Sequence, residues 1–249
     1  MIAVIDSGSG GANVILECLK YYNYDFIYLV DNKNCPYGDK PIEDVKKIII
    51  SNINFLLKKF DIDFIILGCN TASSIIGYEE LERIKCPILK TKPDLPSLVK
   101  QNGKKLLFAT KNTIDNSNYV KYFLLNYNDI KTLYIKSLPK YIDNYLSNVN
   151  KENYEKLEKI LKKGLFFHKK TKKYLKNTTN IALGCTHFKH IEKEITNCFD
   201  KKINYFYCEK NVAKISNFLI KKKKQDFSIK VILTKKDDSL KKSIMDLFL

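Results

Sequence analysis

Short apolar runs alternate with longer amphipathic stretches along almost the whole of this 249-residue chain, and the pattern restarts near residue 105. Apolar runs separated by helical patterns are typical of parallel sheets whose two faces are covered by helices. The expected strands are residues 2–5, 26–30, 64–68, 88–89, 105–109, 132–136, 180–184, 204–207 and 229–233. Helices are expected at about 11–21, 42–58, 141–146, 152–162 and 239–247, from about 70, 113 and 188 onward, and after 204–207 to about 221. The chain is therefore predicted to have an α/β fold.

Two of the expected strands end in the same way. FIILGCNTAS (64–73) and NIALGCTH (180–187) each run from an apolar strand into Gly, Cys and then Thr within two residues. In parallel sheets, ligands bind beyond the carboxyl ends of the strands. We therefore expect the polar residues at these ends to converge on one crevice: Asp6, Ser7, Asp31, Cys69, Asn70, Thr71, Thr110, Cys185, Thr186 and His187.

Each of the two cysteines precedes an expected helix. The positive end of a helix dipole favours thiolate, which serves as nucleophile, metal ligand or general base. If two such thiols flank a substrate, one removes a proton and the other returns one to the opposite face, which inverts a stereocentre without a cofactor. Asp6 and His187 lie close enough in sequence to the strand ends to tune one thiol each.

Two turns add hydrogen-bond donors. The Gly-rich turn DSGSGG (6–11) exposes backbone N–H groups that can hold an anion, although a tight turn alone would also explain it. It is neither a P-loop nor a GxGxxG motif, so nucleotide binding has little support. The turn CPYGDKP (35–41) offers a tyrosine hydroxyl and backbone donors. Together these groups suit a small zwitterion with carboxylate and ammonium groups.

The composition argues against a nucleic-acid protein. Lys plus Arg number 44 against 27 for Asp plus Glu, a net charge of +17. Arg83 is the only arginine, whereas base recognition favours arginine for its paired donors. Two lysine-rich runs, 169–176 and 221–224, still allow weak, salt-sensitive binding to polyanions.

Seven cysteines without a CxxC pair argue against a disulfide framework or a zinc knuckle. No secretory leader or membrane-length apolar run is evident, so a soluble, cytoplasmic protein is expected.

DSGSGG, PYG followed by DKP, GCNTAS, LLFATKNT (106–113) and GCTH occur in this order along the chain. Together they resemble the cofactor-independent glutamate racemases of the aspartate/glutamate racemase superfamily. The resemblance implies two similar domains, each a parallel sheet flanked by helices, with the active site in the cleft between them. It implies a first domain of residues 1–90 and 208–249 and a second of residues 91–207. It further implies a homodimer.

The resemblance also implies an activity. Members interconvert L- and D-glutamate and supply D-glutamate for peptidoglycan, hence for cell-wall biogenesis and cell shape, without metal or pyridoxal phosphate. Cys69 and Cys185 match the two acid/base cysteines, the first expected to act on D-glutamate and the second on L-glutamate. Asp6 and His187 match their acid–base neighbours. Residues matching the family's substrate contacts are Asp6, Ser7, Tyr37, Gly38, Asn70, Thr71, Thr110, Thr113, Thr186 and His187.

The sequence departs from the family in two places. Phe188 and Lys189 follow GCTH, where members usually have Tyr and Pro. A glutamate that members often place in a Pro-rich stretch has no clear counterpart in SLPKYIDNYL (137–146), where Asp143 is the nearest carboxylate. His187 is thus left without an assigned partner.

Three other functions remain open from the residues. One is racemisation of aspartate or another acidic amino acid. Another is a binding or regulatory protein that has kept the cleft but lost the activity. The third is a cysteine hydrolase, which would use one cysteine and leave the repeated motif unexplained.

Overall fold

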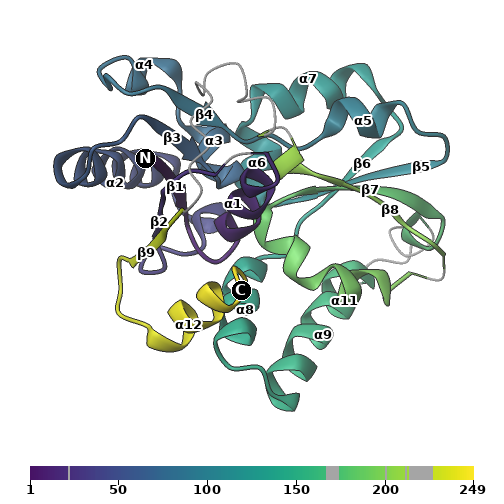
Figure 1. Ribbon diagram of the computed structural model, residues 1–249. Helices are drawn as coiled ribbons and strands as arrows, with labels where there is room; N and C mark the ends of the chain where they lie inside the picture. Colours follow the sequence, from purple (N-terminus) through teal and green to yellow (C-terminus); the bar gives the residue numbers. More distant parts are fainter. Residues whose placement is uncertain (22, 167–173, 200, 211, 213–226) are drawn as a thin grey trace.

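The computed structural model describes residues 1–21, 23–166, 174–199, 201–210, 212 and 227–249. In this part of the chain the strands form two sheets, and every pairing between neighbouring strands is parallel (Figure 1). The order in the first sheet is β4 (Ile88–Lys90), β3 (Phe64–Leu67), β1 (Ile2–Asp6), β2 (Phe26–Val30) and β9 (Ile229–Leu233). The order in the second is β6 (Ile130–Leu133), β5 (Lys104–Ala109), β7 (Thr178–Gly184) and β8 (Asn204–Tyr207).

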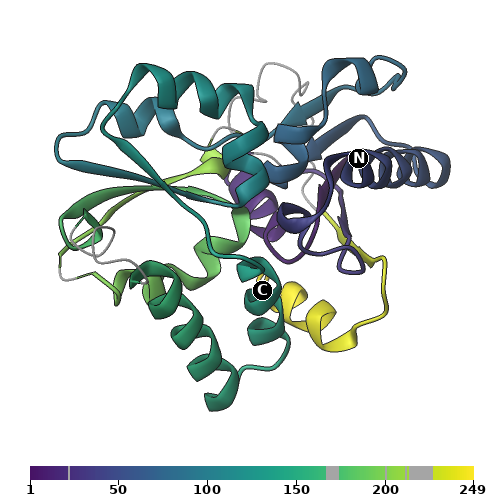
Figure 2. The ribbon, with the colours of Figure 1, turned by 180° about the vertical axis from the view of Figure 1, so that it is seen from behind.

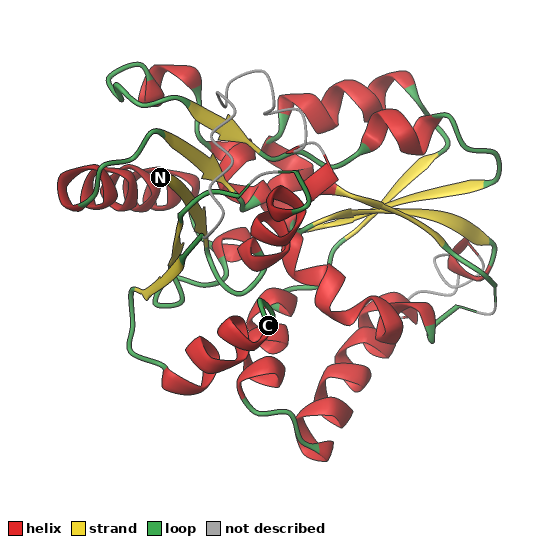
Figure 3. Cartoon of the chain, viewed as in Figure 1, coloured by secondary structure: helices red, strands yellow, loops and turns green. Residues whose placement is uncertain are grey.

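Helices cover both faces of each sheet, as Figures 2 and 3 also show. Those that follow strands of the first sheet are α1 (Gly11–Leu19), α2 (Ile42–Lys59), α3 (Asn70–Ile75), α4 (Tyr78–Leu81) and α12 (Asp238–Asp246). Helix α5 (Leu95–Val99) also follows a strand of the first sheet, β4, but packs against β7 and β8 of the second. Those that follow strands of the second sheet are α6 (Lys111–Asn116), α7 (Asn118–Asn126), α8 (Leu138–Ser147), α9 (Lys151–Phe166) and α11 (Glu192–Thr196). Two 3-10 helices, η1 (Tyr37–Asp39) and η2 (Thr186–Ile191), lie in the described part as well.

Strand β1 shows why the strands read as unbroken apolar runs. Ile2 and Val4 pack with residues of α1 and α12 on one face, whereas Ala3 and Ile5 pack with residues of α2 and α3 on the other. All four side chains are fully buried. A strand covered on both faces has no solvated side, so its sequence does not alternate. The predicted α/β architecture with parallel sheets is confirmed.

The end of the chain returns to the first sheet. Strand β9 pairs with β2, with Phe26 opposite Ile229, although the second sheet lies between them in sequence. Helix α12 then packs against α8, and the two lie side by side in Figure 1. The Ser243 hydroxyl donates a hydrogen bond of 2.6 Å to the carbonyl of Leu146 at the end of α8. Helix α12, which follows a strand of the first sheet, thus contacts α8, which follows a strand of the second sheet.

Three details differ from the prediction. The strand expected at 132–136 is β6 and begins at Ile130, because this buried isoleucine pairs with Lys105 at the start of β5. Helix α5 was not expected. After β7 the chain enters η2 at Thr186 rather than a helix from about residue 188.

Some predictions lie outside the described residues: most of the helix expected to reach about residue 221, most of the lysine run 169–176, and all of 221–224. Within the described residues, no helix combines the length and apolar character needed to cross a membrane.

Candidate active site

The two repeated cysteines occupy equivalent places in the two sheets. Cys69 follows β3 and precedes α3, and Cys185 follows β7 and precedes η2. Both are buried free thiols, at 5% and 6% exposure. They lie near enough for the charge of Cys185 to contribute to raising the pKa of Cys69. The carboxyl ends of the two sheets therefore bring the thiols into one region, as the repeated motif predicted.

The thiol of Cys69 is nevertheless not the thiolate expected from its position before a helix. Burial, together with the nearby Asp6 carboxylate, raises its pKa to about 12. The backbone hydrogen bond from Ala72 at the start of α3 acts in the opposite direction but is the weaker influence. Desolvation disfavours the charged form more than one short helix favours it. In the free protein Cys69 is a neutral thiol at physiological pH.

Asp6 joins the two cysteine motifs. It is fully buried at the end of β1, and its Oδ2 accepts a hydrogen bond of 2.9 Å from the Thr186 hydroxyl, next to Cys185. The following residue, Ser7, places its Oγ 3.8 Å from the sulfur of Cys69. Burial raises the pKa of Asp6, although His187 opposes the shift. One strand end thus contacts the surroundings of both thiols.

The glycines of DSGSGG allow this close approach. A Cβ atom on Gly8 would lie 2.1 Å from Oδ2 of Asp143 and 2.3 Å from Nε2 of His187. A Cβ on Gly10 would lie 2.3 Å from the Thr186 hydroxyl. The N–H of Gly8 donates to Asp6 (3.1 Å), and the N–H of Ser9 donates to Asp143 (3.1 Å). These two donors, expected to hold a ligand anion, instead hold carboxylates of the protein.

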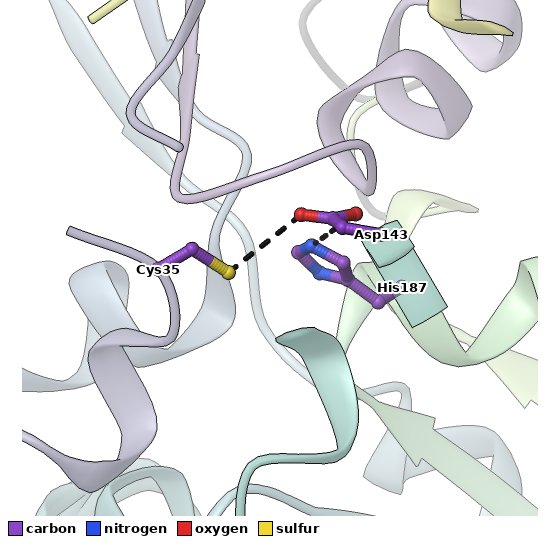
Figure 4. A group of neighbouring side chains, drawn as sticks. All are labelled: Cys35, Asp143 and His187. Atoms are coloured by element: carbon purple, nitrogen blue, oxygen red, sulfur yellow. Dashed lines mark hydrogen bonds and ion pairs between the residues drawn. The ribbon is translucent and has the colours of Figure 1, made fainter. Parts of the chain in front are cut away.

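Asp143 is the residue that the sequence did not assign. It lies on α8, and its Oδ1 is 3.4 Å from Nε2 of His187 (Figure 4). The same oxygen accepts hydrogen bonds from the N–H and, at 2.5 Å, the hydroxyl of Ser9. The other ring nitrogen of His187, Nδ1, lies 3.7 Å from the sulfur of Cys185. His187 therefore has a carboxylate partner and lies between it and a thiol.

Asp143 and His187 form a buried ion pair, at 7% and 1% exposure. Burial alone would lower the pKa of His187, but the Asp143 carboxylate, with smaller contributions from Cys185 and Cys35, outweighs it and raises this pKa well above its usual value. Burial would likewise raise the pKa of Asp143, but His187 and Ser9 together lower it. Each partner stabilises the charged form of the other.

A signal for Asp143 was present in the helix pattern. Pro139, Ile142 and Asp143 are spaced by three and four residues and are all buried, so they share the inner face of α8. A carboxylate on the apolar face of a helix needs a buried partner. This rule identifies Asp143 as a candidate site residue without any sequence motif.

Three threonine hydroxyls connect the two sheets. Thr71 Oγ1, in α3, lies 2.7 Å from that of Thr110 and 3.3 Å from that of Thr113, and the latter two lie 2.9 Å apart. Thr110 follows β5 and caps α6 by accepting from the N–H of Thr113. All three are buried. Their hydroxyl hydrogens rotate freely, so the cluster can offer donors or acceptors to a ligand.

The turn CPYGDKP lies against the second sheet. A Cβ on Gly38 would lie 2.6 Å from the Cβ of Thr110, so only glycine fits there. The amide of Asn112 in α6 donates to the carbonyls of Tyr37 (3.0 Å) and Lys40 (2.9 Å). The Tyr37 hydroxyl, expected near the substrate, donates instead to Asp31 (2.6 Å). It is engaged within the first sheet.

Asn70 is the open donor of the site. Its side chain is 1% exposed, and within the described chain neither its Nδ2 nor its Oδ1 makes a hydrogen bond. Buried amide groups are nearly always paired in folded proteins. The amide next to Cys69, which also lies close to the thiol of Cys208, therefore has unused hydrogen-bonding capacity.

Comparisons with known proteins found similar chains. A curated glutamate racemase from Buchnera aphidicola subsp. Schizaphis graminum is 32% identical over 208 residues, which cover 81% of this chain and 78% of the relative. A crystal structure of a glutamate racemase isoform from Bacillus anthracis aligns with a TM-score of 0.81 at 21% identity, over 100% of this chain and 93% of that one.

The Francisella tularensis glutamate racemase, solved in complex with D-glutamate, aligns with a TM-score of 0.75 at 22% identity, over 99% of this chain and 92% of that one. No protein-family model matches the sequence. The structural matches show the shared fold, and the relative from Buchnera is similar enough over enough of its length to show the family. The chain belongs to the glutamate racemase family.

Proposed function

We propose that this protein interconverts L- and D-glutamate by proton transfer between Cys69, Cys185 and the α-carbon, and that it supplies D-glutamate for peptidoglycan. The observation that carries the proposal is the meeting of two equivalent strand-end thiols in one buried polar region of a chain that belongs to this family. The Francisella relative was solved with D-glutamate, which supports glutamate as the substrate.

The reaction uses the thiols in turn. One thiolate removes the α-proton, and the opposite thiol donates a proton to the other face; in the reverse direction the roles exchange. We assign Cys69 to D-glutamate and Cys185 to L-glutamate. Because the pKa of Cys69 is about 12 in the free protein, its proton must pass to a base, the nearby Asp6 carboxylate, only when substrate is bound. A substrate ammonium within a few ångströms favours the thiolate, which provides that coupling.

The surrounding groups have separate tasks. The open amide of Asn70 and the hydroxyls of Thr71 and Thr110 would receive the carboxylates of the substrate. His187, charged beside Asp143, would serve as the acid–base neighbour of Cys185, whose sulfur its Nδ1 contacts, with Asp143 as a positioning residue. Asp6 would serve as the acid–base neighbour of Cys69, because the Asp6 carboxylate raises the pKa of that thiol.

The proton on an α-carbon is very weakly acidic. The site must therefore stabilise negative charge that develops in the transition state rather than in the bound substrate. Donors that are already fixed before the reaction do this without reorganisation. The buried threonine oxygens meet that requirement in position, because they hold one another at 2.7–3.3 Å.

Racemisation is tested by following circular dichroism of solutions of each glutamate enantiomer with purified protein. The circular dichroism signal should decay to zero whether the reaction starts from L- or from D-glutamate. Cys69→Ser and Cys185→Ser should each abolish racemisation, whereas Cys198→Ser, a half-buried thiol outside the site, should retain it. Full activity in either site variant would refute the two-thiol mechanism.

A substrate panel separates glutamate from aspartate, because one methylene changes where the second carboxylate lies. Turnover of aspartate alone would favour the related racemase activity. An inert protein that still binds glutamate would favour a binding role, and ester hydrolysis that needs one cysteine would favour a hydrolase.

Several further predictions belong to this proposal. We propose a homodimer and a cytoplasmic location, which size-exclusion chromatography with light scattering and cell fractionation would test. We also keep the division into residues 1–90 with 208–249 and residues 91–207. The pairing of β9 with β2 supports the discontinuous first unit.

A further inference from the structure

A second set of donor atoms lies beside the proposed reaction site. Cys35, Asp143 and His187 each place one potential metal-ligand atom within 4.8 Å of the others. They come from three separate segments, the loop after β2, helix α8 and helix η2, and their side chains point toward one another in Figure 4. We propose that these three residues form an inhibitory binding site for Zn²⁺.

The separations suit a tetrahedral ion. The sulfur of Cys35 lies 3.6 Å from Oδ2 of Asp143, whereas Nε2 of His187 lies 3.4 Å from the other oxygen, Oδ1. All three donors lie within 4.8 Å of one another. Zinc bonds of about 2.3 Å to sulfur and about 2.0–2.1 Å to nitrogen and oxygen, at tetrahedral angles, place S and O about 3.5 Å apart and N and O about 3.3 Å apart. The S–O separation thus already matches zinc coordination, and the imidazole nitrogen lies within 4.8 Å of both other donors.

The donors also have free capacity. Oδ1 of Asp143 is held by Ser9, which leaves Oδ2, the oxygen nearer Cys35. Nε2 of His187 is buried and faces Asp143, and it gives up its proton on coordination. Cys35 is a free, half-buried thiol that loses its proton on coordination. Thiolate, imidazole and carboxylate together are a set that zinc prefers, with a fourth position left for water.

Zinc here would act against the reaction. The sequence predicts racemisation without metal, and coordination would take His187 and Asp143 away from Cys185. Binding itself does not depend on the proposed reaction, but its inhibitory effect does. A binding measurement therefore tests the zinc site, and an activity measurement separately tests the inhibition.

Binding is tested on the full chain with Co²⁺, whose thiolate coordination gives a near-ultraviolet charge-transfer band, and with Zn²⁺ in competition with a chromophoric chelator. We expect one ion per chain and a band that Cys35→Ser abolishes. Since loss of one outer-shell partner already weakens zinc sites by roughly 10–100-fold, loss of this ligand should weaken Zn²⁺ by roughly 100-fold or more. Asp143→Asn should also weaken binding, whereas Cys198→Ser should match the wild type.

Activity is then measured with Zn²⁺ present, each variant being compared with its own metal-free rate. The concentration that halves the rate should rise in Cys35→Ser by the same factor as the dissociation constant. The proposal is overturned if Cys35→Ser keeps the cobalt band, or if Cys69→Ser or Cys185→Ser removes it, because the ion would then bind the reacting thiols. If no racemisation is found at all, the proposed function fails while the binding result still decides this site.

Discussion

Replacing Asp143 with asparagine removes one negative charge and almost no volume. Asparagine keeps an oxygen for the two hydrogen bonds from Ser9, so the change isolates the ion pair with His187. Removing one partner of a buried pair costs about 3–5 kcal/mol, because the other charge stays buried without compensation. His187 can limit this cost by releasing its proton, so we expect about 3 kcal/mol.

This cost should be visible in thermal unfolding followed by circular dichroism. For a chain of 150–250 residues, each kcal/mol lowers Tm by roughly 2–4 °C, so Asp143→Asn should lower it by roughly 6–12 °C. The same substitution at Asp115, whose ion pair with Lys111 is exposed, should change stability by less than about 1 kcal/mol. Asp115→Asn is therefore the matched control.

A double-mutant cycle with His187→Gln separates the pair from other effects of each change. Contacting residues in one network typically show coupling energies of about 0.5–3 kcal/mol, and this pair should lie in the upper half of that range. Additivity within about 0.5 kcal/mol, or a Tm for Asp143→Asn equal to that of the wild type, would show that no ion pair is present. The kcat for glutamate should fall in the same variant with a smaller change in KM, since Asp143 positions His187 rather than contacting substrate.

Gly8→Ala should lower racemisation at least about tenfold and destabilise the fold by about 1–3 kcal/mol, because the added Cβ has no space. The control is Gly77→Ala, whose Cβ meets only a flexible glutamate side chain. Equal activity of the two variants would contradict the packing argument. Asn70→Ala should leave Tm nearly unchanged, since the Asn70 amide is unpaired in the free protein, but should lower kcat/KM by roughly 100-fold. A large loss of stability without loss of activity would contradict the assignment of Asn70 to substrate binding. At pH 8 only about one in ten thousand Cys69 thiols is ionised, so iodoacetamide should label Cys69 more slowly than half-buried Cys198. Equal labelling rates of the two cysteines, measured by peptide mass spectrometry, would contradict the raised pKa.

The arrangement of the strands was largely predictable because the pattern of apolar runs reports burial on both faces. The strand end at Cys69 and the one at Cys185 follow from the same reasoning, since parallel strands present their carboxyl ends at one edge. The start of β6 was misplaced because Ile130 stands alone between polar residues, and only its pairing with Lys105 identifies it as part of the sheet. Local sequence does not contain that pairing.

The site was less predictable where contacts join distant segments. The glycines around Ser9 suggested a turn open to a ligand, but their purpose becomes visible only when the segment around Thr186 lies against them. Asp143 carries no motif, and its importance comes from its distance to His187. The raised pKa of Cys69 likewise depends on burial by residues far away in the chain. Such properties belong to the folded arrangement.

The position of β9 has a consequence for synthesis on the ribosome. All strands of the second sheet are made before residues 229–233, whereas β2 keeps an open edge until those residues emerge. An unpaired strand edge is a surface on which other chains can assemble. The half of the molecule that is translated first is therefore the half that is completed last, and a nascent chain halted before its final strand exposes that edge while its second sheet already has every strand it needs.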